Sequence, residues 1–216
     1  MTVRISSLCL FAFLAGCEQG ALEPTLADVE IDNQDINDVE DVDEAEASVE
    51  PLTIDFGSTS EDSWYAVNDT VMGGVSEGIV EYSSDSMVFE GMVSTANNGG
   101  FASVRSISDS MNLRDFERVV IRMKNEGQPF TLVLADTPNW WEGQFRYDLE
   151  VEGSGWTEIA IDLNEFEFFD FSTGYPRPTG EMMKRRDRKE ILYLEFMSAL
   201  FEDGEFLLEV DHITFE

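Results

Sequence analysis

Few residues in this chain could act as nucleophiles or bind a metal through sulfur or nitrogen. The chain has two cysteines, Cys9 and Cys17, and one histidine, His212. Cys17 directly follows Leu14-Ala15-Gly16, at the end of the apolar run of residues 8–14. This run is too short to cross a bilayer of about 30 Å as a permanent helix. The small residues before Cys17 fit a signal peptidase, so we expect residues 1–16 to be a lipoprotein signal peptide and Cys17 to be lipidated.

The predicted processing leaves little catalytic chemistry in the mature domain. Cys9 would leave with the signal and Cys17 would carry lipid, so no thiol remains for a disulfide, a metal cluster or a nucleophile. His212 alone cannot build a multi-histidine zinc site. The sequence has neither a dinucleotide-binding G-x-G-x-x-G motif nor a P-loop. We expect no catalytic residue and no cofactor, although the many carboxylates leave room for a structural calcium ion.

The segment of residues 18–50 is acidic and lacks the residues that build a core. It contains 13 Asp or Glu residues, no Lys or Arg and no aromatic residue. Such a segment cannot bury enough apolar surface to fold. As a flexible coil it would span about 30 Å, and charge repulsion would extend it. We therefore expect residues 17–50 to form a disordered tether that ends in the lipid on Cys17 and has no binding role of its own.

The remaining residues, 51–216, are also acidic. They carry 32 Asp or Glu against 12 Lys or Arg, a net charge of about −20. A phosphate backbone requires clustered cations, and the one dense group here is Lys184-Arg185-Arg186-Asp187-Arg188-Lys189. We expect no nucleic-acid partner. The cationic group is interpreted as a solvated turn or short helix, with docking to an acidic partner as the alternative.

Residues 51–216 are long enough for one domain with one core. Apolar residues alternate or run in short blocks that predict strands. Examples of such blocks are residues 87–89, 119–123, 130–134 and 206–210. Turn residues such as Gly127-Gln128-Pro129 and Asp203-Gly204 recur between them, a rhythm typical of an antiparallel sandwich. Helix is expected only around residues 182–188, with a brief turn near 113–116. The Phe-rich run 166–171 is expected to be a loop across the sandwich with most rings buried, and a partner-docking patch formed by some of its rings is the alternative.

The most distinctive residues of the domain lie in two glycine-rich blocks. The candidate ligand- or partner-binding residues in these blocks are Trp64, Asn68, Asp69, Met72, Gly73, Gly74, Ser76, Asn97, Asn98, Gly99, Gly100, Phe101 and Arg105. The chain here resembles the complex I intermediate-associated protein 30 family. Its members share a tryptophan, an Asn-Asp-x-x-Met-Gly-Gly-x-Ser block and an Asn-Gly-Gly-Phe strand, and residues 156–166 and 204–215 also resemble the family. The resemblance covers roughly residues 52–216.

The resemblance implies an all-β, galactose-binding-like jelly-roll β-sandwich with a role in assembly or binding, and it brings no catalytic residue. The residues themselves agree with this architecture. Paired glycines allow positive φ and close backbone approach, so Gly73-Gly74 and Gly99-Gly100 are expected at tight corners. Asn and Asp side chains there can satisfy nearby backbone donors. Two interpretations stay open, namely a structural corner and a surface for a ligand or partner.

A second candidate site is the pair Trp140-Trp141, which follows Asp136-Thr137-Pro138-Asn139. If this segment were a strand, the two rings would point to opposite faces and at least one would be exposed. A flat ring beside carboxylates and amides is what a sugar-binding surface uses. Large aromatic residues are more often part of the core. Burial and a ligand platform are therefore both considered for this pair.

These features lead to three functional hypotheses. The first is a non-catalytic binding or assembly accessory lipoprotein that recognises a protein or protein complex of the cell envelope. The second is a carbohydrate-binding surface module, and the third, least favoured, is a carboxylate-based hydrolase. Glu18 after the lipidated cysteine favours the outer membrane over the periplasmic face of the inner membrane. Export would separate the domain from the cytoplasmic arm of a bacterial complex I. We therefore expect this chain to share only the fold and the binding character of the family.

Overall fold

The computed structural model describes residues 49–57, 63–151, 153–198, 200 and 202–216. These residues belong to one compact unit. The expected signal peptide, Cys17 and nearly all of the expected tether lie outside them. No helix among the described residues has the length and hydropathy to span a bilayer.

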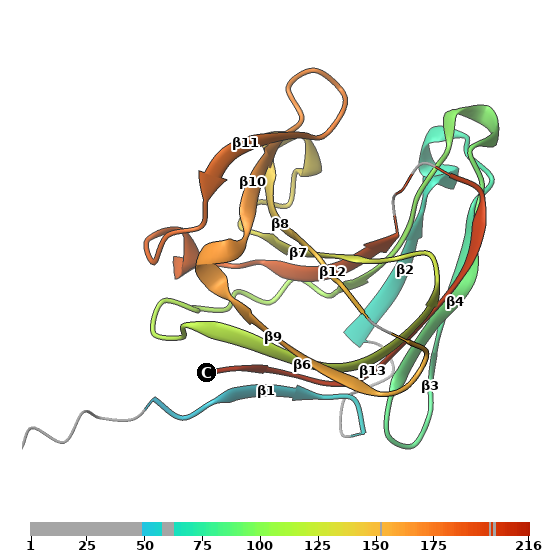
Figure 1. Cartoon of the computed structure of the whole chain (residues 1–216). Coiled ribbons are helices and arrows are strands. Elements are labelled where there is room, and N and C mark those ends of the chain that lie inside the picture. Colours follow the sequence, from blue (N-terminus) through green and yellow to red (C-terminus); the bar gives the residue numbers. More distant parts are fainter. Residues whose placement is uncertain (1–48, 58–62, 152, 199, 201) are drawn as a thin grey trace, which may run out of the picture. The chain divides into compact units, whose positions relative to one another are not determined.

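The described residues form thirteen strands in two antiparallel sheets, joined by turns and short 3-10 segments (Figure 1). The six-stranded sheet contains β1 (Leu52–Asp55), β3 (Glu77–Tyr82), β4 (Met87–Val93), β6 (Arg118–Gly127), β9 (Thr157–Asp162) and β13 (Gly204–Phe215). Its order is β3-β4-β13-β6-β9, and β1 pairs with the last part of β13. The long strand β13 therefore pairs with three other strands, β1, β4 and β6.

The seven-stranded sheet has the order β11-β10-β8-β7-β12-β5-β2. Its strands are β2 (Trp64–Asn68), β5 (Ala102–Ser106), β7 (Thr131–Ala135), β8 (Gln144–Asp148), β10 (Glu167–Asp170), β11 (Arg177–Met182) and β12 (Tyr193–Ser198). In Figure 1 this sheet curves, with β10 and β11 at one end, β2 at the other, and β7 and β12 between them.

The core lies between the sheets because alternate residues of each strand point inward. In β13, Phe206, Leu208 and Val210 are buried, and the strand shifts register between Val210 and His212. This bulge brings Ile213 and Phe215 back to the inner face, where both are fully buried. The strands expected at residues 87–89, 119–123, 130–134 and 206–210 are confirmed as parts of β4, β6, β7 and β13.

Two local expectations were wrong. Residues 177–182 are strand β11, and the only helical turn near 182–188 is the 3-10 segment Asp187–Lys189. The Phe-rich run forms strand β10 and not a loop, because Glu167 and Phe168 pair with Arg146 and Phe145 of β8. The expected turn near 113–116 is present, closed by the hydrogen bond from the Phe116 N–H to the Leu113 carbonyl.

The cationic group 184–189 is only partly a solvated turn. Arg188 is 4% exposed, and its guanidinium donates to the carbonyl of Phe116 at 2.9 Å and to Asn164 Oδ1 at 2.6 Å. Arg185 forms an ion pair with Asp115. These contacts fasten the segment between β11 and β12 to the turn before β6.

Candidate functional site

Asp69 is the centre of the glycine-rich corner. Its carboxylate is fully buried and accepts hydrogen bonds from Ser76 N–H at 2.9 Å, Ser76 Oγ at 2.6 Å, Gly100 N–H at 2.7 Å and Phe101 N–H at 3.3 Å. Burial alone would raise the pKa of Asp69, but these hydrogen bonds outweigh it and hold the pKa below its ordinary value. One carboxylate therefore joins the segment after β2 to the segment before β5.

The paired glycines allow the chain to wrap around this carboxylate. A Cβ on Gly74 would lie 2.3 Å from the Asp69 carboxyl carbon, and one on Gly99 would lie 2.4 Å from Asp69 Oδ2. Gly73 has φ 90°, a left-handed conformation that favours glycine. Asn97 and Asn98 also have positive φ, at 57° and 61°, which asparagine tolerates better than most residues.

The other candidates in these blocks have different environments. Trp64 is 4% exposed and packs against Phe56 and Phe196, so it belongs to the core. Asn68 Nδ2 donates to the Gly78 carbonyl at 3.1 Å. Asp69 and Ser76 are fully buried and bonded to each other, so their side chains stabilise the corner.

Three of the exposed residues of the corner are apolar. Val71, Met72 and Val75 are 77%, 59% and 47% exposed. They surround the Gly73-Gly74 turn, and we refer to these three residues as the apolar tip. Asn97 and Asn98 are exposed as well.

The second site is the outer face of the seven-stranded sheet, turned away from the core. Residues facing one another across its strands form a row, which runs Tyr65, Arg105, Glu195, Val133, Arg146 and Glu167. The neighbours of these residues along each strand, such as Leu132 and Phe196, belong to the core cluster, whereas Val133 does not. Side chains of the row therefore point away from the core.

Polar groups of this outer face are buried and connected. Arg105 Nη2 donates to both oxygens of Glu195 at 3.1 Å, and its guanidinium lies 4.3 Å from the Tyr193 ring centroid. Burial alone would lower the pKa of Arg105, but Glu195 outweighs it and raises the pKa. Gln144 Nε2 donates to Tyr193 Oη at 2.7 Å, and Arg146 Nη2 donates to Gln144 Oε1 at 3.1 Å. Side-chain hydrogen bonds and an ion pair thus connect the polar groups of this face.

The tryptophan pair lies beside this face. Trp140 and Trp141 are 42% and 55% exposed and belong to a 3-10 turn between β7 and β8. Their rings meet edge to face at 5.9 Å, and Trp140 meets Phe171 in the same way at 5.7 Å. The strand geometry considered for this pair is wrong, and so is the interpretation as core residues. The turn exposes both rings.

Within this turn Glu142 accepts hydrogen bonds from Thr137 Oγ1 at 2.6 Å and Asn139 Nδ2 at 2.9 Å. These bonds fix the backbone that carries the tryptophans. The two rings therefore lie at the edge of the outer face, on a turn that these hydrogen bonds stabilise.

Residues 54–210 match the sequence model of the family described as Complex I intermediate-associated protein 30 (CIA30). The chain belongs to the CIA30 family. No curated protein shows a significant sequence match to the chain.

Solved structures similar to this CIA30-family domain include carbohydrate-binding modules. One is the family 11 carbohydrate-binding module of the cellulosomal cellulase Lic26A-Cel5E of Clostridium thermocellum, with 14% identity and a TM-score of 0.55, covering 78% of this chain and 95% of that chain. Another is a Clostridium thermocellum family 11 module in complex with a β-1,3-1,4-mixed-linked tetrasaccharide, with 15% identity, the same TM-score and coverages of 78% and 96%. The expected galactose-binding-like jelly roll is confirmed as the fold.

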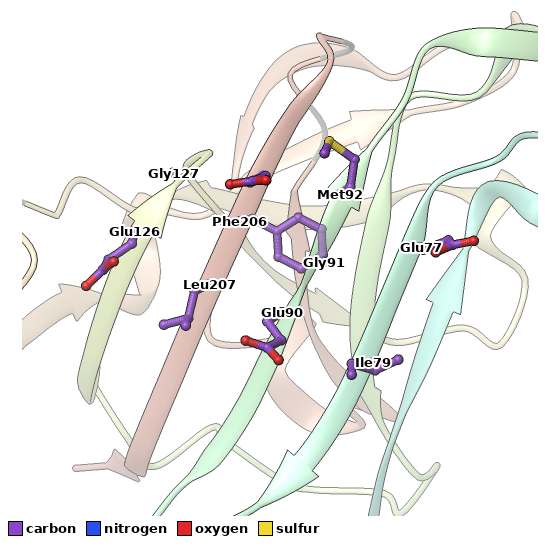
Figure 2. A pocket seen from close by; sticks show the side chains of 10 residues that line it. Glu77, Ile79, Glu90, Gly91, Met92, Glu126, Gly127, Phe206 and Leu207 are labelled. Carbon is purple, nitrogen blue, oxygen red and sulfur yellow. The ribbon is translucent and has the colours of Figure 1, made fainter.

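The CIA30-family domain also has a groove on the outer face of the six-stranded sheet, with a volume of about 610 Å³ (Figure 2). Ile79, Met92 and Leu207 contribute apolar side chains to it. Its acidic lining residues are Glu77, Glu90, Glu126 and Glu205. Nothing cationic lines the groove, and among the described residues no group of three or more His, Cys, Asp or Glu is placed to hold a metal ion.

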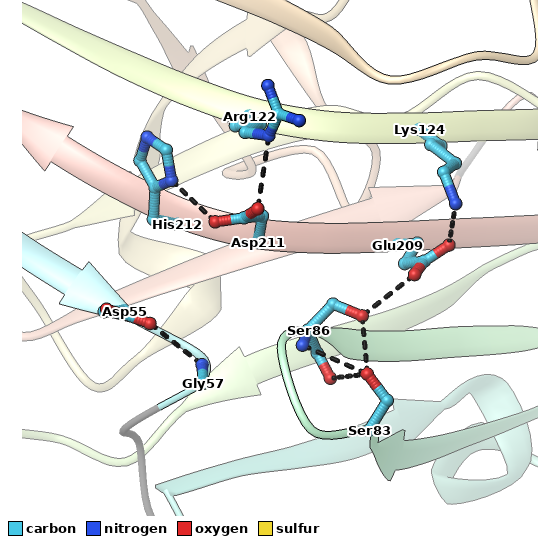
Figure 3. A network of polar contacts seen from close by, with 9 residues as sticks. All are labelled: Asp55, Gly57, Ser83, Ser86, Arg122, Lys124, Glu209, Asp211 and His212. Carbon is cyan, nitrogen blue, oxygen red and sulfur yellow. Dashed lines mark hydrogen bonds and ion pairs between the residues drawn. The ribbon is translucent and has the colours of Figure 1, made fainter.

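Farther along the same sheet the charges are paired (Figure 3). Lys124 Nζ lies 2.6 Å from Glu209, Arg122 Nε lies 3.1 Å from Asp211, and His212 Nδ1 lies 2.7 Å from Asp211. His212 is therefore a strand histidine beside a carboxylate that is already paired. This surface of the CIA30-family domain is a solvated ion-pair network.

Four outer-face residues were missed in the sequence as site candidates. They are Gln144, Arg146, Tyr193 and Glu195. The available signal was alternation, because Gln144 and Arg146 alternate with the aromatic Phe145 and Tyr147, and Glu195 separates Leu194 from Phe196. Alternation marks such residues as outward, but it does not indicate that they are buried.

Proposed function

We propose that this CIA30-family domain is a non-catalytic carbohydrate-binding module that binds its ligand across the outer face of the seven-stranded sheet. The observation that carries the proposal is the exposed pair Trp140 and Trp141. Side-chain hydrogen bonds of Glu142 stabilise the turn that carries the two rings, and this turn lies beside the connected polar groups of the outer face. Sugar rings have apolar faces that pack on aromatic rings and hydroxyl edges that hydrogen bond to polar groups. The two parts of this surface match those two requirements.

The fold relatives support this proposal. The similar family 11 modules are described as carbohydrate-binding, and one was solved with a mixed-linked tetrasaccharide. The identities of 14% and 15% make them relatives in fold, so the ligand class rests on the residues of this chain. The polar side chains of the outer face are already hydrogen-bonded to one another, so they would lose less conformational entropy when a ligand binds.

The test is a glycan array followed by calorimetric titration with the full chain in detergent. We expect Trp140→Ala plus Trp141→Ala to weaken binding at least about tenfold, since buried aromatic contacts dominate such sites. Trp156→Ala is the matched control, because Trp156 is 37% exposed but packs over Lys124 of the other sheet. Binding that is equal in the double variant and the parent chain, or absent for every glycan, would refute the proposal.

A second candidate function is protein binding through the apolar tip. Val71, Met72 and Val75 are exposed together, on a corner fixed by Asp69. Exposed apolar residues that cluster on a rigid corner are typical of interaction surfaces. A pull-down from solubilised cell envelope would compare the parent chain with Val71→Ser plus Met72→Ser, with Ile79→Ser as control on a different surface. Recovery of the same proteins by all three would exclude the tip as the binding surface.

We propose further that the domain is displayed on a membrane through lipid on Cys17, with residues 18–50 as the tether. The support is the sequence Leu14-Ala15-Gly16-Cys17 after an apolar run, and the lack of cations in the tether. Mass spectrometry of the mature chain should find an acylated N-terminal Cys17. An unprocessed chain that begins at Met1 in the cytoplasm would overturn the anchor and the envelope address together.

A further inference from the structure

Arg146 is a nearly buried cation on the outer face without a carboxylate partner. The residue is 9% exposed, yet among the described residues it forms no ion pair. Its Nη2 donates to Gln144 Oε1, and its Nε is buried without a hydrogen-bond partner. Burial lowers the pKa of Arg146 in spite of the fields of Glu195 and Asp148.

The carboxylates around Arg146 are engaged with other groups. Glu195 accepts both hydrogen bonds from Arg105, and Asp148 accepts one from Thr131 Oγ1 at 2.7 Å. Glu167 lies directly opposite Arg146 across the strands, but its Oε1 accepts from the Gly180 N–H at 2.6 Å. All three carboxylates therefore accept hydrogen bonds from other groups, and none of them is hydrogen-bonded to the Arg146 guanidinium.

This arrangement contrasts with the composition of the domain. Residues 51–216 have 32 carboxylates for 12 cations, so a counter-ion for a buried arginine was readily available. A buried charge without a partner is destabilising, and an opposite charge placed beside it restores much of that free energy. An external anion would supply that partner.

Aromatic rings beside Arg146 limit which ligands could fit there. Arg146 lies 4.8 Å from the Phe171 ring centroid and 5.4 Å from that of Phe169. Phe171 in turn contacts Trp140, which is exposed. A chain of rings thus leads from the buried cation to the solvent-facing tryptophans, and a ligand that follows it needs an anionic group and an apolar ring face.

We infer that the domain takes an acidic saccharide, with a sugar carboxylate paired to the Arg146 guanidinium and sugar rings packed on Trp140. This inference rests on the carbohydrate-binding function proposed above and narrows it to uronate-containing chains. Arginine suits this role because its planar group can bind a carboxylate through two parallel hydrogen bonds.

The decisive experiment compares charged and neutral ligands on the unaltered full chain in detergent. The acidic probes are tetrasaccharides of galacturonate, mannuronate and glucuronate, and the neutral ones are their methyl esters and the corresponding galactan, mannan and glucan tetrasaccharides. We expect at least one uronate to bind about tenfold or more tightly than its methyl ester, as for a charge-assisted hydrogen bond. The ester keeps the ring and removes the charge.

Variants locate the effect. Arg146→Gln should abolish the preference of the protein for the acid over its ester, and Arg146→Lys should retain part of it. Arg122→Gln is the matched control, because it removes one positive charge from the opposite sheet, where Arg122 is paired with Asp211. Thermal unfolding of each variant shows whether it is folded, and the comparison of acid with ester in the parent chain does not depend on any variant.

The outcomes separate the two proposals. Equal binding of acids and esters, binding of neutral tetrasaccharides alone, or an unchanged preference in a folded Arg146→Gln would overturn the acidic ligand and leave the carbohydrate module in place. No binding by any probe would overturn both. An acid preference that persists in Arg122→Gln and is lost in Arg146→Gln would establish the inference.

Discussion

Asp69 is a fully buried carboxylate that, among the described residues, is held by neutral donors alone. Four hydrogen bonds from Ser76, Gly100 and Phe101 take the place of a cation. Replacing a carboxylate oxygen with an amide NH2 turns an acceptor into a donor that faces other donors. The corner is therefore sensitive to a change of very small volume.

We expect Asp69→Asn to lower the free energy of unfolding by about 3 kcal/mol, since it leaves buried donors without an acceptor. Chemical denaturation of the two chains would measure this difference. Asp203→Asn is the control, because Asp203 accepts hydrogen bonds from Thr95 at an exposed position. A loss for Asp69→Asn no larger than for the control would show that the corner does not depend on the charge.

The lowered pKa of Asp69 also predicts how stability depends on pH. Its stabilising contribution is complete above the ordinary value of 3.8 and is lost as pH falls through the lower folded-state pKa. The stability difference between the parent chain and Asp69→Asn should therefore be constant at neutral pH and should shrink below about pH 4. Denaturation at a series of pH values tests this, and a difference that grows with acidity would contradict it.

Some of these residue roles could be predicted from the sequence and some could not. The positive φ at Gly73 and the close approach at Gly74 and Gly99 follow from the rule that paired glycines form tight corners. Asp69 was expected to satisfy local backbone donors, yet two of its donors, Gly100 and Phe101, lie about thirty residues away. A contact of this range depends on the pairing of β2 with β5, which no local pattern contains.

At the scale of elements, Gly99 allows the connection between the 3-10 segment Ala96–Asn98 and β5 to pack closely against Asp69 and Ser94. Gly99→Ala places a methyl carbon 2.4 Å from Asp69 Oδ2 and 2.8 Å from the Ser94 carbonyl oxygen, so this connection must shift. We expect a loss of about 2 kcal/mol in unfolding free energy. Gly155→Ala is the control, since no atom lies within 4 Å of its added carbon. Equal unfolding midpoints for the two variants would contradict the close packing.

Strands were predictable where one face is apolar, because period-two alternation directly reflects burial on one side. The strands β10 and β11 were missed for a related reason. The Phe-rich segment of β10 lacks alternation, and residues 177–182 of β11 are exposed throughout. Neither shows the pattern of a half-buried strand. Their pairing depends on a neighbouring strand, since β10 pairs with β8 and β11 pairs with β10. The environments of Glu195 and Arg146 likewise depend on distant segments, since Glu195 is bonded to Arg105 and Arg146 lies against Phe169 and Phe171.

At the scale of the whole molecule, charge is the dominant property. The chain has a net charge of −32, and glutamates line the groove of the six-stranded sheet without a cation among them. Repulsion between like charges destabilises a compact state, and salt screens it. Stability should therefore rise with ionic strength.

We expect an increase in salt from about 0.01 M to about 0.15 M to raise the melting temperature by roughly 3 °C. Glu90→Gln plus Glu205→Gln removes two charges of the groove, so this variant should melt higher at low salt and respond less to added salt. Calorimetry at the two salt concentrations would measure both effects. A melting temperature that falls with salt would mean that attractive ion pairs, such as Lys124 with Glu209, outweigh the repulsion.

Strand β13 has a consequence for the time course of synthesis. It is the last of the described strands along the chain, yet it lies between β4 and β6 and also pairs with β1. During translation the earlier strands of the six-stranded sheet emerge before the strand that joins them, so we expect this sheet to form only after β13 has left the ribosome.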